Sequence, residues 1–229
     1  MIHLITGAGS GIGAAVARAL HERGDEVWLL ARTAERAADL ERALPGARTV
    51  VGDLADPASL EAITGLPERL DTLLHIAGVV DLAPVAEVDA DQLRAQVDVN
   101  LVAPMLLTKV CLPALRAAQG LVLVANSSAG LTASPTWSAY AASKFGVRAF
   151  ADALRGEEQD HGVRVTTVYP SRTATPMQEK VHEQEGRTYD RRRWIQPETV
   201  AATILHVIDL PPDATIPEVT IRPLVPRPT

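Results

Sequence analysis

The 229-residue sequence predicts an α/β fold, a doubly wound parallel sheet of about seven strands with helices on both faces. Two observations predict it. Short apolar runs alternate with longer helical patterns from end to end, and several of these runs are apolar on both faces, as in strands covered from each side. Repeated strand–helix alternation implies right-handed crossovers between parallel strands. No linker or change of composition divides the chain, so we expect residues 1–229 to form a single Rossmann-type domain.

The elements can be assigned in chain order. Strands are predicted at IHLIT (2–6), EVWLLA (26–31), RTVV (48–51), TLLHIA (72–77), LVLVAN (121–126), VRVTTVY (163–169) and EVTIR (218–222). Helices are predicted at 11–23, 34–43, 57–64, 91–118, 137–160 and 197–209. Asp56-Pro57 is typical of a helix start, and Gly24 follows a helix end. Segment 171–196 has no clear periodicity; we favour a substrate-binding lid there over a disordered surface loop.

Composition excludes several classes of protein. With 47% hydrophobic and 22% charged residues, the chain is typical of a soluble globular protein. A net charge of −6 argues against nucleic-acid binding. Cys111 is the only cysteine, so we expect neither an internal disulfide nor a cysteine metal cluster. No stretch approaches about 18 uninterrupted apolar residues, and the first residues lack the features of a secretory signal. We therefore expect no membrane span and a cytoplasmic location.

A glycine-rich turn, TGAGSGIG (6–13), follows the first strand directly. Gly7, Gly11 and Gly13 would keep the turn tight and let the next helix approach the sheet. The start of that helix offers unpaired N–H groups and the positive end of its dipole to a pyrophosphate. Glycines mark many turns, so a tight turn without a ligand is the alternative.

A second motif lies in WSAYAASKFG (137–146), where Tyr140 and Lys144 fall one helical turn apart on one face. A phenol has a pKa of about 10, and a nearby ammonium could lower it. The alternative is a packed tyrosine beside a solvated lysine. The chain has only three lysines among its 22 lysine and arginine residues, so a lysine at this position is harder to explain as chance.

The spacing of the glycine turn, TGxxxGxG, resembles that of the short-chain dehydrogenase/reductase family. The resemblance extends over nearly the whole chain. It includes Asp53 in VVGDL, Asn100 in VNL, Ser127 in NSSAG thirteen residues before Tyr140, and the segment YPSRTATPM (169–177).

The resemblance implies an oxidoreductase that interconverts an alcohol and a carbonyl compound by hydride transfer. Its catalytic residues would be Asn100, Ser127, Tyr140 and Lys144, with Tyr140 as the acid/base, and it would use no metal. The implied cofactor contacts are Gly7, Ser10, Gly11, Ile12, Gly13, Arg32, Asp53, Leu54, Ala77, Gly78, Tyr140, Lys144, Pro170, Thr173 and Thr175.

The end of the second strand bears on the choice of cofactor. An acidic residue there would bind the adenosine ribose and repel a 2′-phosphate, but this chain has Ala31 followed by Arg32. A guanidinium can pair with a 2′-phosphate. We therefore expect NADP(H) to be preferred over NAD(H), unless Arg32 is simply a surface arginine.

Two departures from the family pattern leave rival functions open. HIAG (75–78) replaces NNAG, so Ile76 cannot supply an amide, and Ser171 replaces a glycine. They favour a catalytically silent nucleotide-binding sensor or scaffold as the alternative function. A nucleotide-sugar epimerase or dehydratase is disfavoured, since little chain remains for a substrate domain. We expect His75 to be packed or locally bonded rather than a proton relay.

The predicted partners are a small-molecule substrate and other copies of the chain. Helices 91–118 and 137–160 resemble those that pair between subunits in the family, which implies a homodimer or homotetramer. The two helices could instead be fully covered within one chain. The substrate itself cannot be identified, although Trp137, Met177 and Trp194 suggest a moderately hydrophobic alcohol or ketone.

Overall fold

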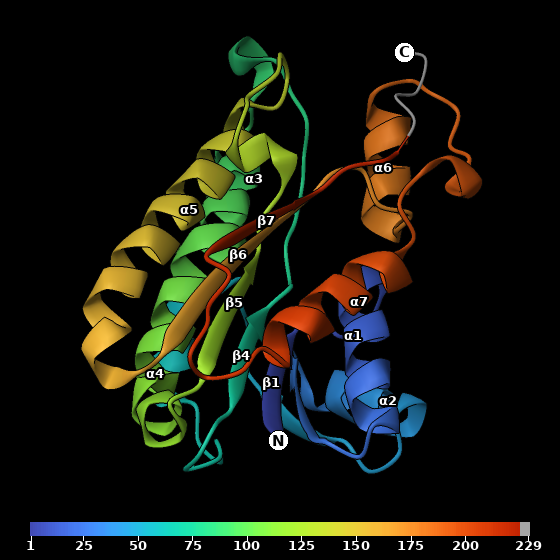
Figure 1. Cartoon of the computed structure of the whole chain (residues 1–229). Helices are drawn as coiled ribbons and strands as arrows, with labels where there is room; N and C mark the ends of the chain where they lie inside the picture. The colour runs from blue at the N-terminus through green and yellow to red at the C-terminus, as the bar shows by residue number, and fades with distance from the viewer. Residues whose placement is uncertain (225–229) are drawn as a thin grey trace.

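The computed structural model describes residues 1–224, in which seven parallel strands form one sheet (Figure 1). The strand order is β3-β2-β1-β4-β5-β6-β7, which confirms the predicted fold class. The order reverses between β1 and β4, and ligands of such sheets bind at the carboxyl ends of strands beside that point. The strands are β1 Ile2–Thr6, β2 Glu26–Ala31, β3 Arg48–Val51, β4 Thr72–His75, β5 Leu121–Ala125, β6 Arg164–Pro170 and β7 Glu218–Ile221.

Helices cover both faces of the sheet, as Figure 1 shows. On one face lie α1 (Gly11–Glu22), α2 (Ala34–Ala43) and α7 (Pro197–Ile208); on the other lie α3 (Ala90–Val97), α4 (Ala103–Ala118) and α5 (Ser138–Glu158). Successive side chains of β1 enter different cores: Ile5 packs with Leu20 of α1, whereas Leu4 packs with Leu107 of α4. The strands are apolar on both faces because each face meets a helical layer.

Several predicted elements take a different form. The predicted helix 57–64 is a 3-10 helix, Pro57–Ala62, and α5 ends at Glu158 before a 3-10 turn, Gln159–His161. Segment 171–196 contains α6 (Pro176–Gln184) and a 3-10 turn, Arg191–Arg193, rather than an irregular loop. Thr175 caps α6 by accepting the Gln178 N–H, a local signal that periodicity alone does not reveal. Further 3-10 turns are Val85–Glu87 and Ser128–Gly130.

The predicted helix 91–118 is interrupted by a π-helical turn, Asp98–Val102, between α3 and α4. The Ala103 N–H bonds to the carbonyl of Asp98, five residues back. Pro104 follows and has no N–H to donate to the preceding turn, which favours a break in the α-helical pattern here. The π turn contains Asn100, and such turns often occur at functional sites.

The helical stretch Ala90–Ala118 is long and apolar enough to cross a membrane by length and composition, with a mean hydropathy of 1.5. In the structure, α4 packs on the sheet through Ala103, Leu107 and Leu115, which are fully buried. The core helix of a soluble protein meets the same criteria, so this stretch is weak evidence for a membrane span.

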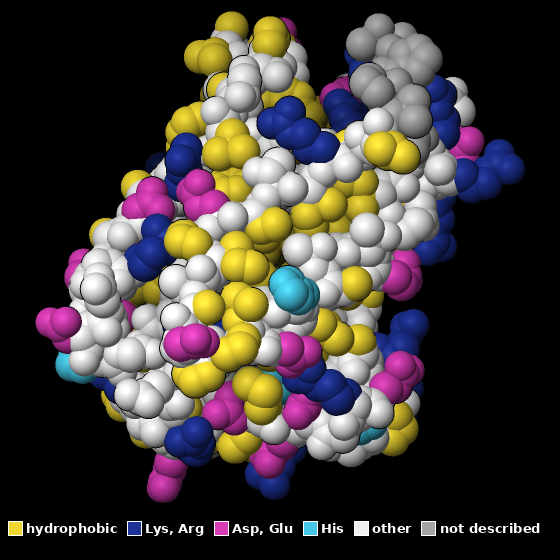
Figure 2. All heavy atoms as spheres, in the orientation of Figure 1, with side chains coloured by type: hydrophobic (Ala, Val, Ile, Leu, Met, Phe, Trp, Pro, Cys, Tyr) yellow, Lys and Arg dark blue, Asp and Glu magenta, His cyan; other side chains and the backbone are white. Residues whose placement is uncertain are grey.

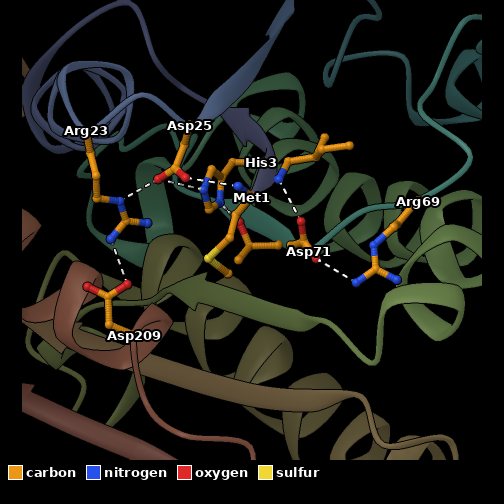
Figure 3. Close-up of polar contacts among 9 residues, drawn as sticks. Met1, His3, Arg23, Asp25, Arg69, Asp71 and Asp209 are labelled. Carbon is orange, nitrogen blue, oxygen red and sulfur yellow. Dashed lines mark hydrogen bonds and ion pairs between the residues drawn. The ribbon is translucent and has the colours of Figure 1, made fainter.

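Charged groups tie the amino ends of the central strands together (Figure 3). Arg23 bonds to Asp25 at 2.5 Å and to Asp209, just beyond α7, at 2.6 Å. Asp71, which precedes β4, accepts the Ile2 N–H at 2.7 Å. These contacts fix the ends of α1 and α7 and the start of β1 and β4 at the edge of the sheet opposite the candidate site.

Candidate active site

The turn between β1 and α1 lies very close to the segment after β4. A Cβ on Gly7, whose φ is +76°, would lie 2.7 Å from the backbone nitrogen of Ala77. A Cβ on Gly13 would lie 2.2 Å from the carbonyl oxygen of Gly7. Only glycine fits these two positions. The start of α1 is thereby held against the sheet, where its N–H groups can receive a pyrophosphate.

Thr6 supports the segment that departs from the family pattern. Its buried hydroxyl accepts the N–H groups of Ile76 and Ala77, each at 3.1 Å. The backbone after β4 is therefore held although Ile76 has no amide. His75 is buried, and its Nε2 lies 2.8 Å from the Thr108 hydroxyl. Burial lowers the pKa of His75 to about 3, so the ring is neutral and locally bonded, as expected.

A cleft of about 230 Å³ opens beside this turn. It suits a dinucleotide because the close-packed glycines leave their backbone accessible from one side. Eleven of the predicted cofactor contacts line it, namely Gly7, Ser10, Gly11, Ile12, Gly13, Ala77, Gly78, Tyr140, Lys144, Pro170 and Thr175. Sequence reasoning missed Ile76, Ala125, Asn126 and Pro176, which line the same cleft, and it expected Met177 only at the substrate, although Met177 lines this cleft too.

Four predicted cofactor contacts lie outside this cleft. Arg32 is exposed just after β2, and Asp53 accepts the N–H of Ala55 at 2.9 Å. Leu54 packs against the core on the α4 face. Thr173 is buried and lines a neighbouring cavity instead.

Arg36 is a candidate that the sequence did not indicate. A Cβ on Gly9 would lie 2.4 Å from its Nη2 atom, so the guanidinium lies over the glycine turn. Its side chain is about half exposed and lies 3.6 Å from Asp39. Its position in the first turn of α2 did not indicate this contact. The contact joins α2 to the glycine turn, two segments that come together only in the folded chain.

A second cavity, of about 300 Å³, adjoins the cofactor cleft. Both are lined by Ile12, Asn126, Tyr140, Pro170, Thr175 and Met177, so they meet at Tyr140. Ser127 lines the second cavity beside that phenol. Figure 2 shows a notch in the surface at the top of the molecule, beside the segment that precedes α5. The second cavity is thus placed to hold a substrate beside the cofactor.

Tyr140 and Lys144 are buried together on α5. The Lys144 Nζ donates to the carbonyl oxygen of Ala125 at 3.1 Å and lies 5.7 Å from the centroid of the Tyr140 ring. Burial raises the pKa of Tyr140 to about 12, partly offset by a hydrogen bond with Ser127. Burial also lowers the pKa of Lys144 to about 8. In the chain alone burial sets the net direction of both pKa shifts, because it disfavours charge on both groups; a lowering of the tyrosine pKa by Lys144 and a bound cofactor stays a prediction.

Asn100 connects the segment after β4 to α5. Its Oδ1 accepts the Val79 N–H at 2.9 Å, and its Nδ2 donates to the Val79 carbonyl at 2.9 Å and to the Ser143 hydroxyl at 3.0 Å. The π turn places this side chain between the two segments. Asn100 therefore fixes the backbone next to Gly78, one wall of the cofactor cleft.

Asn126, which sequence reasoning missed, connects Ser127 to the helix that carries Lys144. Its Oδ1 accepts the Ser127 N–H at 2.8 Å, and its Nδ2 donates to the Lys144 carbonyl at 3.0 Å. A Cβ on Gly130 would lie 2.3 Å from the Asn126 Oδ1, so a glycine is needed opposite it. The sequence feature that could have indicated Asn126 is its position at the end of a predicted strand, directly before Ser127.

The serine at position 171 does not disturb the chain. Its φ is not in the left-handed region, so a glycine is not needed there. Its N–H donates to the Ile221 carbonyl at 2.9 Å, which extends the pairing of β6 with β7.

The lowered pKa of Lys144 predicts a pH-dependent stability. Between about pH 8 and 10.5 the unfolded chain holds a lysine proton that the folded chain has released, so stability rises with pH. From pH 8 to 10, the unfolding free energy of the cofactor-free protein should rise by about 2 kcal/mol relative to Lys144→Met, in urea titrations. Exposed Lys109→Met is the control and should show no such difference; a pH-independent gap between wild type and Lys144→Met contradicts the prediction.

Comparisons with known proteins agree with this geometry. The family model described as short chain dehydrogenase matches residues 1–186. The chain is 32% identical to an uncharacterized short-chain type dehydrogenase/reductase, y4eK, of Sinorhizobium fredii, covering 97% of this chain and 91% of that protein. It is 33% identical to dehydrogenase/reductase SDR family member 7B of Bos taurus over 81% of this chain, and it spans 62% of that protein's length.

Solved structures are also similar. Levodione reductase superposes with a TM-score of 0.83 at 26% identity, covering 96% of this chain and 95% of that one. The closed form of serine dehydrogenase complexed with NADP+ gives a TM-score of 0.86 at 24% identity, covering 98% and 95%, which shows the fold alone. The chain belongs to the short-chain dehydrogenase/reductase family, and it is an NAD(P)-binding oxidoreductase.

Proposed function

We propose that this enzyme interconverts an alcohol and a ketone or aldehyde with NADP(H), using Tyr140 as the acid/base. One observation carries the proposal. The Tyr140 phenol stands where the cofactor cleft meets the second cavity, with Ser127 hydrogen-bonded to it and Lys144 buried one turn along the same helix.

In the proposed reaction a residue of the chain supplies the proton that the substrate oxygen takes up. Bound NADP(H) supplies or accepts the hydride. In reduction, the carbonyl carbon gains hydride and its oxygen becomes an alkoxide, which takes the proton of the Tyr140 hydroxyl. The phenol, whose pKa burial raises to about 12, is protonated near neutral pH and so carries the proton to be donated. The Ser127 hydroxyl would hold and polarise the substrate oxygen.

Lys144 and Asn100 complete the proposed set. Lys144 would bind the ribose hydroxyls of the nicotinamide half and stabilise the phenolate after proton transfer. Asn100 holds the wall of the cleft at Val79 through its side-chain amide, so we assign it a positioning role. A water link from Lys144 to solvent beside Asn100 remains a prediction.

We also propose that residues 1–229 form one domain and that segment 171–196 is its lid. Contacts between α6 and the segment after β4 support the lid: Lys180 pairs with Asp81 at 2.6 Å, and Gln184 accepts the Leu82 N–H at 3.2 Å. These bonds close the lid over the second cavity, which Val181 and Trp194 line from the lid side.

The alternative of a silent sensor or scaffold loses its support. It rested on Ile76 and Ser171. The Thr6 hydroxyl holds the backbone at Ile76, and Ser171 adopts a conformation open to any residue. Neither departure therefore weakens the site.

Removing the Tyr140 hydroxyl tests the acid/base role. We expect Tyr140→Phe to lower kcat by about a hundredfold or more, because the alkoxide loses its proton donor. NADPH binding, followed by nucleotide fluorescence, should change little. Tyr169→Phe, which deletes a hydroxyl bonded to Glu218 away from both cavities, is the control. Turnover within tenfold of wild type in NADPH oxidation at 340 nm would remove the role from Tyr140.

The preference for NADP(H) is supported by two guanidinium groups that follow β2, one of which lies over the glycine turn. Arg32 follows β2 directly and is exposed, and Arg36 lies over Gly9 of the glycine turn. Two cations there favour a 2′-phosphate and leave NAD(H) as the weaker cofactor. A related structure from Beutenbergia cavernae, 27% identical, was solved with NADP bound at low occupancy.

The cofactor preference predicts a specific loss. Arg32→Ala should weaken NADPH binding about tenfold while NADH binding changes less, because only NADPH carries the phosphate that the guanidinium pairs with. Arg42→Ala, also exposed and on the outer side of α2, is the matched control. Equal titration curves for NADPH in wild type and Arg32→Ala would contradict the assignment.

We further propose that the protein is a homodimer or homotetramer that pairs through α3, α4 and α5 and works in the cytoplasm. Leu93, Met105 and Phe145 are 38%, 43% and 42% exposed on these helices, a large apolar content for a solvated face. Light scattering after size exclusion should give the mass of two or four chains. The mass of one chain would show that these side chains stay exposed.

A further inference from the structure

The proposed mechanism leaves one feature of the second cavity unused. Among the described residues that line this cavity, Arg172 is the one charged side chain. It lies shortly after β6, in the stretch that leads to α6. Arg172 therefore stands where the chain passes from the sheet to the proposed lid.

The charge of Arg172 is compensated within the wall of the cavity. Its two terminal nitrogens bond to both carboxylate oxygens of Glu185, at 2.8 and 2.5 Å. Both side chains are largely buried, at 26% and 14% exposure. Burial acts to raise the pKa of Glu185, but the bonds and charge of Arg172, together with the charges of Arg187 and His182, hold the pKa below its usual value. The pair therefore presents no net charge to the cavity.

Aromatic rings flank this pair. The Arg172 guanidinium carbon lies 5.8 Å from the ring centroid of Trp137 and 5.6 Å from that of Trp194. Trp137 in turn meets the Tyr140 ring edge to face, with centroids 5.8 Å apart. The wall is thus a continuous row of flat groups that runs from the reacting phenol to the lid.

We propose that the Arg172–Glu185 pair sets the substrate class: a neutral ketone or alcohol with an aromatic or alicyclic body, with carboxylates excluded. This inference rests on the proposed function. The flat wall favours a ring stacked against Trp137. A carboxylate entering the cavity would lose its hydration and find the guanidinium already engaged by Glu185.

The same wall separates the second cavity from an outer one. Trp137 and Arg172 line both, and the outer cavity is also lined by Glu185 and by Arg187, whose guanidinium lies 3.8 Å from the Glu185 carboxylate. Because the Arg187 side chain is 55% exposed, solvent screens its charge more than it screens the buried pair. A substituent opposite the reacting carbonyl, such as the para position of a phenyl ketone, would therefore approach the pair. The charge of that substituent is what the pair should discriminate.

Wild-type enzyme gives the first test, with acetophenone and 4-acetylbenzoate as a neutral and an anionic probe of one shape. Measured by NADPH oxidation, kcat/KM should favour acetophenone at least tenfold. Equal or better turnover of 4-acetylbenzoate would overturn the inference. If other carbonyl compounds react but acetophenone does not, the inference fails and the proposed function stands. If no carbonyl compound is reduced, the proposed function itself fails.

Neutralising Glu185 gives the second test. In Glu185→Gln the guanidinium of Arg172 loses its counter-charge and is free for a substrate carboxylate. The preference for acetophenone over 4-acetylbenzoate should fall at least tenfold. The double variant Glu185→Gln with Arg172→Leu should lose this gain, because the cation is gone.

Glu183→Gln is the matched control, since it makes the same change two residues earlier at an exposed position of α6. It should keep the wild-type preference. NADPH binding reports that each variant is folded. An unchanged preference in folded Glu185→Gln, or the same gain in Glu183→Gln, would overturn the role of the pair; the wild-type comparison decides the substrate class if Glu185→Gln does not fold.

Discussion

The site depends on the close contact between the end of β1 and the segment after β4. The Thr6 hydroxyl accepts two successive N–H groups of that segment. The backbone of Gly7 lies closer to the backbone of Ala77 than a side chain at position 7 would allow. This contact fixes the floor of the cofactor cleft with backbone atoms. It also explains why the side chains at positions 75 and 76 can differ from the family pattern, because the amide that the family supplies is not what holds the chain here.

Much of this arrangement could be predicted from the sequence. The alternation of apolar runs and helical periods fixes a doubly wound sheet, and the structure confirms seven parallel strands. The glycine turn and the Tyr140–Lys144 spacing identify which strand ends carry the site. Those features are local: each depends on residues within a strand, a turn or one helical turn, where periodicity and spacing carry information.

The missed features come from contacts between distant segments. Arg36 reaches the glycine turn from α2, Asn126 bonds across to α5, and Arg172 meets Glu185 beyond α6. No spacing rule joins such positions. The π turn around Asn100 was also hidden, because one extra residue in a turn barely changes a helical hydrophobic pattern. The rise of the Tyr140 pKa in the chain alone was hidden for a related reason, since the spacing places the ammonium nearby but does not show how deeply the phenol is buried.

Burial shifts the pKa values of both ionisable groups at the reacting centre. It disfavours the phenolate of Tyr140 and the ammonium of Lys144 alike, and Glu185 cancels the charge of Arg172 in the adjoining wall. Near neutral pH the main charge that the chain itself places beside the phenol is the Lys144 ammonium, which at a pKa of about 8 is still mostly protonated. A positive nicotinamide ring would add a second positive charge in a poorly hydrated site, where it would act with little screening. The ring present after carbonyl reduction would favour the phenolate, and the neutral ring present before it would not. The redox state of a bound cofactor would therefore shift the acidity of Tyr140 in addition to any effect of Lys144.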